Sequence, residues 1–101
     1  MEITVAGRHP GITQEMRAYA LDKVGKLPRI FDRLSSARVT LEVNGVEHRA
    51  EASVHGPRGA VFVAHGVALD PSGAVDELVD RLERQLRKFK TKIEGHRLLR
   101  A

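Results

Sequence analysis

The sequence predicts an α+β fold, a four-stranded mixed sheet with two helices packed on one face in the order β-α-β-β-β-α. Four short runs alternate apolar with polar residues, and two longer runs repeat apolar residues every three or four positions. The long connection through the first helix permits parallel pairing of the first two strands, and the short turns that follow imply antiparallel neighbours. A chain of 101 residues has room for one domain.

The first strand and the first helix occupy the N-terminal quarter of the chain. Ile3 and Val5 alternate with polar residues before a turn-like segment, as expected for a strand. Thr13 is a suitable N-cap for the helix that follows. Its apolar stripe consists of Met16, Ala20, Val24 and Leu27. Because Pro28 cannot continue the helical hydrogen bonds, the helix is expected to stop near Leu27.

Three further strands are predicted in the middle of the chain. The second contains Val39, Leu41 and Val43, and the third contains Ala50, Ala52 and Val54. A turn at Asn44-Gly45 and a loop at Gly56 to Gly59 connect them to each other and to the fourth strand.

The register of the last hairpin is predicted from its apolar alternation. If the loop closes a hairpin, Val54 lies opposite Val61 and Ala52 lies opposite Val63, which places both apolar sets on one face. The same register places His65 on the apolar face, near an open end of the sheet.

The second helix gives the clearest periodic signal. Asp70 can cap its start and Pro71 fits the first helical position, where a missing N–H costs nothing. Its apolar stripe consists of Val75, Leu78, Leu82, Leu86, Phe89 and Ile93. Gly95 is expected to end the helix. The predicted organisation is therefore one domain over residues 1–95 and a short basic tail over residues 96–101.

The positive charge of the chain is concentrated at its C-terminal end. Residues 84–100 contain seven Lys or Arg and one acid, whereas the residues before them contain ten basic and twelve acidic residues, so the net charge of +4 arises there. Segregated charge of this kind is typical of a protein that binds a polyanion, and nucleic acid is the first candidate.

The basic residues of the second helix permit two interpretations. Arg81, Arg84, Lys88 and Lys92 share one stripe, opposite the apolar one. A solvated surface is one interpretation, because i,i+4 acid–base pairs stabilise a helix. These pairs are Glu77–Arg81, Asp80–Arg84 and Glu83–Arg87. Beyond Arg87 the positive charges of the stripe repel one another, since Lys88 follows Arg84 by four residues and precedes Lys92 by four. This repulsion favours neutralisation of the stripe by phosphates.

Other candidate contacts are weaker. Lys23 and Lys26 flank the first helix beside Tyr19, where a solvated flank is equally consistent, and Arg8 lies in a segment already explained as a turn. The three phenylalanines suit a core, so only Tyr19 could stack on a base. Binding should therefore rely on phosphates and shape.

The sequence contains no pattern typical of an enzyme or a metal site. Cysteine is absent, which excludes disulfides and thiol catalysis, and the five histidines are scattered without metal-ligand spacing. No serine lies in a nucleophile elbow, and the glycines at Gly56 to Gly59 lack the G-K-[ST] ending of a phosphate loop. No run approaches membrane-spanning length. We expect a cytoplasmic, non-catalytic protein without cofactor or small-molecule substrate, monomeric when free.

Three segments of the chain resemble the ribosome hibernation promoting factor family. They read I-T-V-A-G-R-H-P-G-I-T from Ile3, K-L-P-R-I-F-D-R from Lys26, and V-D-E-L-V-D-R-L-E-R-Q-L-R-K-F-K-T-K from Val75. Pro71-Ser72 stands where the family commonly has Met-Tyr. The resemblance implies a short form, without the C-terminal domain that dimerises ribosomes in long members and without the acidic tail of the related ribosome-associated inhibitor.

The resemblance also implies a fold similar to double-stranded RNA-binding domains, a function and a set of contacts. Family members lodge between the head and body of the small ribosomal subunit, where messenger and transfer RNA would bind, and block translation in stress or stationary phase while the idle ribosome is preserved. Carried over by position, the implied RNA contacts are Arg84, Arg87, Lys88, Lys90 and Lys92, with Arg8, Lys23, Lys26 and Arg33 as weaker ones. The alternative hypothesis is a regulatory adaptor whose basic helix meets an acidic protein.

Overall fold

One mixed sheet and two helices make up the part of the chain that the structure, a computed structural model, describes: the backbone of residues 1–100 and the side chains of residues 1–94. The elements are β1 (Glu2–Gly7), α1 (Gln14–Val24), the 3-10 turn η1 (Leu27–Arg29), β2 (Ser36–Asn44), β3 (Glu47–His55), the 3-10 turn η2 (Pro57–Gly59), β4 (Val61–Ala68) and α2 (Pro71–Arg100). The predicted element order is confirmed.

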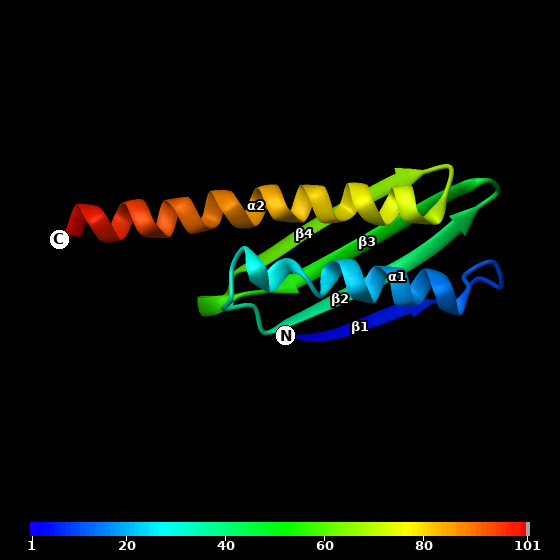
Figure 1. Ribbon diagram of the computed structural model, residues 1–101, viewed down its shortest axis with the longest axis horizontal. Helices are drawn as coiled ribbons and strands as arrows, with labels where there is room; N and C mark the ends of the chain where they lie inside the picture. The colour runs from blue at the N-terminus through cyan, green and yellow to red at the C-terminus, as the bar shows by residue number, and fades with distance from the viewer. Residues whose placement is uncertain (101) are drawn as a thin grey trace.

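The sheet has the strand order β1-β2-β3-β4, with β1 parallel to β2 and the other neighbours antiparallel, as predicted. Both helices cover the same face of the sheet, and α2 runs beyond its end (Figure 1). The core lies between these layers, and its largest fully buried side chains include Leu27, Leu78, Leu82 and Leu86. Burial of Leu78, Leu82 and Leu86 fixes α2 on the sheet, and the opposite side of α2 remains in solvent.

The helix starts follow the predicted capping chemistry. The Thr13 hydroxyl accepts a hydrogen bond from the Met16 N–H at 3.2 Å, and the Asp70 carboxylate accepts one from the Gly73 N–H at 3.4 Å. α1 ends at Val24, slightly before the predicted stop, and Leu27 is buried from η1 instead.

The predicted register of the β3–β4 hairpin is wrong by one residue on β4. Val54 pairs with Phe62, and His55 pairs with Val61. The loop is one residue shorter than predicted, because Gly56 N–H donates to Ala60 O at 2.8 Å and closes a five-residue connection. The shift turns Phe62 into the core and leaves Val61 and Val63 49% and 57% exposed. Burying a phenyl ring gains more apolar area than burying a valine.

The same shift corrects the prediction for His65. Its side chain lies on the outer, exposed face of the sheet, and Gly66 takes the inward position beside α2. A Cβ atom at Gly66 would lie 2.1 Å from the Ala74 carbonyl oxygen, which is far inside contact distance. The absence of a side chain at this residue therefore allows the start of α2 to pack directly on β4.

The predicted helix end at Gly95 is also wrong, because α2 continues to Arg100. A glycine inside a helix costs only about 1 kcal/mol relative to alanine, and no proline follows to stop the helix. Residues 96–100 therefore continue α2 rather than forming a separate tail, while Ala101 lies outside the described residues.

Candidate RNA-binding surface

The surface of α2 begins with a flank that is tied to the sheet edge. Arg81 donates a hydrogen bond to the His65 carbonyl oxygen at 2.9 Å, and Gln85 donates one to the Val63 carbonyl oxygen at the same distance. Because β4 is an edge strand, these contacts satisfy carbonyl groups that would otherwise face water or another strand. The flank that contains Arg81 and Gln85 is called the β4 flank below.

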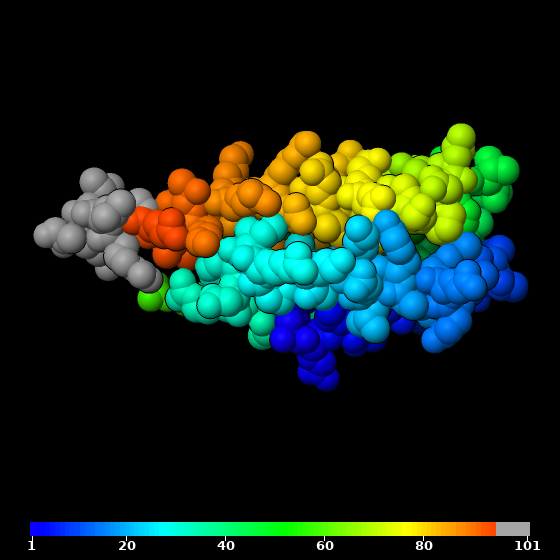
Figure 2. Space-filling model, viewed as in Figure 1, coloured from blue at the N-terminus to red at the C-terminus, as the bar shows by residue number. Residues whose placement is uncertain are grey.

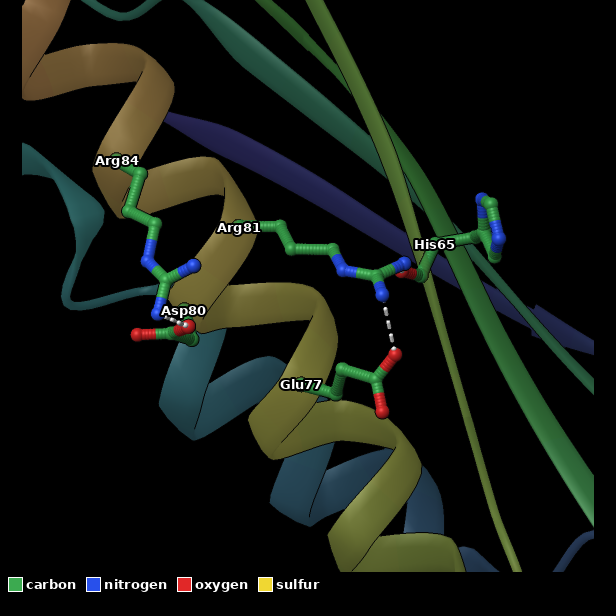
Figure 3. A network of polar contacts seen from close by, with 5 residues as sticks. All are labelled: His65, Glu77, Asp80, Arg81 and Arg84. Atoms are coloured by element: carbon green, nitrogen blue, oxygen red, sulfur yellow. Dashed lines mark hydrogen bonds and ion pairs between the residues drawn. The ribbon is translucent and has the colours of Figure 1, made fainter.

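Arg81 is therefore engaged within the protein. Besides its contact with His65, its guanidinium lies 2.8 Å from the Glu77 carboxylate, as Figure 3 shows. Arg84 points away from the strand and pairs with Asp80 at 2.9 Å. Of the predicted contact residues, Arg81 has the most intramolecular partners and is the least available for a phosphate.

The remaining i,i+4 acid–base pair of α2 is the last one before a stretch of the helix without acidic residues. Arg87 lies 3.9 Å from Glu83, at the limit of ion-pair distance, and both charges of this pair are solvated. An exposed pair of this kind contributes little to stability and can exchange its partner. Between Glu83 and Glu94 the helix contains no acid.

Lys88 and Lys92 lie in this acid-free stretch, and both are exposed. Among residues 1–94, no carboxylate lies within ion-pair distance of either ammonium group. Each lies four residues from the next cation of the predicted stripe, so the two repel each other along the helix. They are rigidly presented, since Leu86 and Phe89 beside them pack into or against the core.

The weaker predicted residues lie elsewhere. Lys23 lies over the Tyr19 ring, 5.6 Å from its centroid, and Lys26 pairs with Asp22 at 3.3 Å. Arg8 is exposed in the β1–α1 connection, at the far end of the molecule from the basic half of α2 (Figure 1). Arg8 therefore does not join the surface formed by Lys88 and Lys92.

Arg33 and Lys90 come together on the other flank of α2. They line one groove between η1, the segment after it, and the C-terminal half of α2, and Arg29 lines the same groove. In Figure 2 the atoms of this segment, drawn in cyan, lie against the orange part of α2. Arg29 was missed by the sequence analysis, although it stands in the same K-L-P-R-I-F-D-R segment that supplied Lys26 and Arg33.

Tyr19 links the two helices instead of offering a free ring. Its hydroxyl donates a hydrogen bond to the Asp76 carboxylate. This bond raises the pKa of Tyr19 above its ordinary value of 10.0, because ionisation would break it, and desolvation and the negative charges of Asp76, Asp22 and Asp70 act in the same direction.

We expect the pKa of Tyr19 to lie above its ordinary value of 10.0, so that the phenolate forms at a higher pH than in a free tyrosine. The raised pKa in the folded state means that the bond stabilises the fold below pH 10 and that its contribution is lost as the pH rises through the raised value. Tyr19 is the sole tyrosine and the chain has no tryptophan, so ultraviolet absorbance reports its ionisation directly. Asp76→Asn should lower the midpoint, and an unchanged midpoint would contradict the assignment.

The comparisons with known proteins identify the family of the chain. A family model described as Sigma 54 modulation protein / S30EA ribosomal protein matches residues 3–94, which is most of the chain. The chain belongs to this family. The resemblance inferred from the three sequence segments is thereby confirmed.

Relatives of this chain from two organisms are named ribosome hibernation promoting factor. A protein from Pseudomonas putida named ribosome hibernation promoting factor is 35% identical over 92 residues, which cover 91% of this chain and 89% of that protein. The protein of the same name from Escherichia coli K12 is 34% identical over 96 residues, covering 95% of this chain and all of that protein. This shared name denotes no catalytic activity.

Solved structures confirm the S30EA fold of the chain. The N-terminal domain of Protein Y from Thermus thermophilus superposes with a TM-score of 0.77 at 35% identity, covering 88% of this chain and 99% of that one. A ribosomal subunit interface protein from Coxiella burnetii gives a TM-score of 0.77 at 29% identity, covering 90% and 99%.

Within the part of the chain that the structure describes, no three His, Asp or Glu side chains gather as a metal site would require. Within the same part, neither helix combines the length and the apolar composition needed to cross a bilayer.

Proposed function

We propose that this protein is a ribosome hibernation factor that binds the small ribosomal subunit at the decoding region of cytoplasmic ribosomes. Bound there, it excludes messenger and transfer RNA and preserves the idle ribosome. Its membership of the S30EA family and the names of its relatives support the ribosome as partner. The basic half of α2 supports ribosomal RNA as the surface that it contacts.

The observation that carries the proposal is the pair of unneutralised cations Lys88 and Lys92. Two ammonium groups that repel each other on a rigid helix destabilise the free protein slightly, and a phosphate backbone relieves that repulsion while releasing its own counterions. Arg84 and Arg87 can join them by exchanging their solvated carboxylate partners for phosphates. Lys90, Lys23, Lys26, Arg8 and Arg33 remain proposed contacts, and Arg81 is the weakest.

The proposed mechanism is steric occupation. The rigid helix lies in the path of messenger and transfer RNA, and the phosphate contacts hold it there. Regulation then depends on how much protein is present and how tightly it binds, without a chemical step.

Competition on purified small subunits tests this proposal. The protein should cosediment with small subunits, and saturating amounts should prevent the binding of a messenger RNA and of initiator transfer RNA. Simultaneous binding of all three would contradict occupation of the decoding region.

The salt dependence of the same binding distinguishes RNA from an acidic protein as the partner. About five phosphate contacts give a log–log slope against salt of magnitude roughly 4, whereas a protein interface with a few rim charges gives a shallower slope. A shallow slope would favour the adaptor hypothesis.

A further inference from the structure

A groove of about 500 Å³ lies between the segment that follows α1 and the C-terminal half of α2. Arg29 and Arg33 line it from one side and Lys90 lines it from the other. These residues are some sixty positions apart in the sequence, and only the packing of α2 beside η1 brings them together. Apolar residues, including Pro28 and Ile93, and the acidic residues Asp32 and Glu94 also line it.

The walls of the groove are held in place by an aromatic cluster. The Phe89 ring of α2 makes edge-to-face contacts with Phe31 at 5.5 Å and with Phe62 at 5.1 Å between centroids. The Arg33 guanidinium lies over the Phe31 ring, 5.2 Å from its centroid. Such contacts orient the guanidinium and still leave its N–H groups free to donate.

The charges of the groove suit an anion. Within residues 1–94, Arg29, Arg33 and Lys90 form no ion pair, even though Asp32 and Glu94 line the same groove. The three cations outnumber the two carboxylates. A ligand with phosphate groups can therefore neutralise all three cations while the two acids stay in solvent.

The groove and the lysine pair lie on different flanks of α2. Lys92 follows Gln85 by seven residues and so lies on the β4 flank, because residues seven apart share a side of a helix. Lys90 follows Glu83 by seven and Asp76 by fourteen, and Asp76 is the residue that contacts Tyr19 of α1. Lys90 therefore belongs to the flank that faces α1 and η1.

We propose that the groove of Arg29, Arg33 and Lys90 binds a second segment of RNA backbone, separate from the segment that Lys88 and Lys92 contact. The end of α2 then lies between two sugar-phosphate chains and contacts one of them with each flank. This inference rests on the proposed binding to ribosomal RNA and adds a second contact to it. A helix held between two RNA segments would resist dissociation more than one lying on a single segment, because both contacts must open together.

Directed cleavage of RNA from single cysteines tests the proposal. The chain has no cysteine, so Asp32→Cys in the groove, Lys88→Cys on the outer surface and Arg38→Cys on the opposite face of the sheet each give a unique attachment site for an iron chelate. On small subunits, positions 32 and 88 should cleave different segments of the RNA, and position 38 should cleave weakly.

The outcomes separate this inference from the proposed function. Cleavage from position 88 without cleavage from position 32, or cleavage of one shared segment by both, would overturn the second contact and leave RNA binding intact. Absence of cleavage from all three positions would overturn RNA binding itself. Cleavage of a ribosomal protein in place of RNA from position 32 would also overturn the inference.

A matched set of neutral variants gives an independent measurement. The groove variant Arg29→Gln/Arg33→Gln/Lys90→Gln should weaken binding to small subunits by roughly tenfold or more and should reduce the magnitude of the salt slope by about 2, as the loss of three phosphate contacts requires. The control variant Arg38→Gln/Arg49→Gln/Arg58→Gln removes the same charge from the outer sheet face and the hairpin loop. Equal weakening by both variants would mean that only net charge matters and would overturn the groove as a site.

Discussion

Replacing both Lys88 and Lys92 by Glu is expected to weaken binding to small ribosomal subunits by roughly a hundredfold or more at about 0.1 M salt. Two charge-assisted contacts contribute about 1.5 kcal/mol each, and each 1.4 kcal/mol is tenfold in affinity. The new carboxylates also repel the phosphates, so this figure is a lower bound. Equilibrium binding of a fluorescently labelled protein to purified subunits measures the change.

The control for this variant must alter the same amount of charge elsewhere. Arg38→Glu/Arg58→Asp does so on the outer sheet face and at the left-handed residue of the hairpin loop, where Asp is tolerated. Both variants should unfold near the wild-type urea concentration, because all four residues are exposed. If the lysine variant binds as tightly as the control, α2 does not provide the RNA contact.

Gly66→Ala is expected to cause the largest loss of stability of any single methyl addition to this chain, about 3 kcal/mol or more. The added Cβ would lie 2.1 Å from the Ala74 carbonyl oxygen and 2.6 Å from the Leu78 nitrogen, and backbone atoms cannot rotate away as a side chain does. α2 must therefore shift off β4, which loosens the packing of Leu78 and Leu82. Urea unfolding followed by circular dichroism measures the loss.

Gly45→Ala is the matched control. Gly45 has a φ of +65° and no atom within 4 Å of an added Cβ, so the substitution tests backbone conformation without a clash and should cost about 1 kcal/mol. The Gly66 variant should also bind small subunits less well, since α2 carries the basic surface. Equal stability of the two variants would contradict the close packing of α2 on β4.

Much of the fold could be predicted because local patterns and burial agree. The stripe from Val75 to Ile93 has helical spacing, and these residues do pack on or into the core. The caps at Thr13 and Asp70 were predictable because they depend on chemistry within three residues. The strand order followed from the lengths of the connections.

The hairpin register could not be obtained in the same way. Val61 and Val63 alternate as in a buried strand, but Phe62 lies between them and is also apolar. Alternation alone therefore does not show whether the two valines or the phenylalanine face the core. The outcome depends on whether Phe89 is placed to receive the ring, which is a tertiary contact. Gly95 was misjudged because a glycine only weakens a helix, whereas the residues that follow it favour one.

The features of the candidate surface also differ in whether local sequence patterns predict them. The run of basic residues and the i,i+4 acid–base pairs of α2 were readable from the sequence, and the ion pairs of Arg81, Arg84 and Arg87 are present. The contact of Arg81 with β4 and the meeting of Arg29 with Lys90 were not, because each joins elements distant in the sequence. Because Arg81 contacts β4, it is the least available of the predicted residues for a phosphate. The groove that Arg29 and Lys90 line together adds Arg29 to the candidate residues.

A density map of the protein bound to a purified small subunit tests the central claim most directly. The expected map places the exposed side of α2 against ribosomal RNA in the path of messenger and transfer RNA, with the ammonium groups of Lys88 and Lys92 at salt-bridge distance from phosphates. A map in which these two lysines face solvent, or contact only the acidic side chains of a protein, would contradict it.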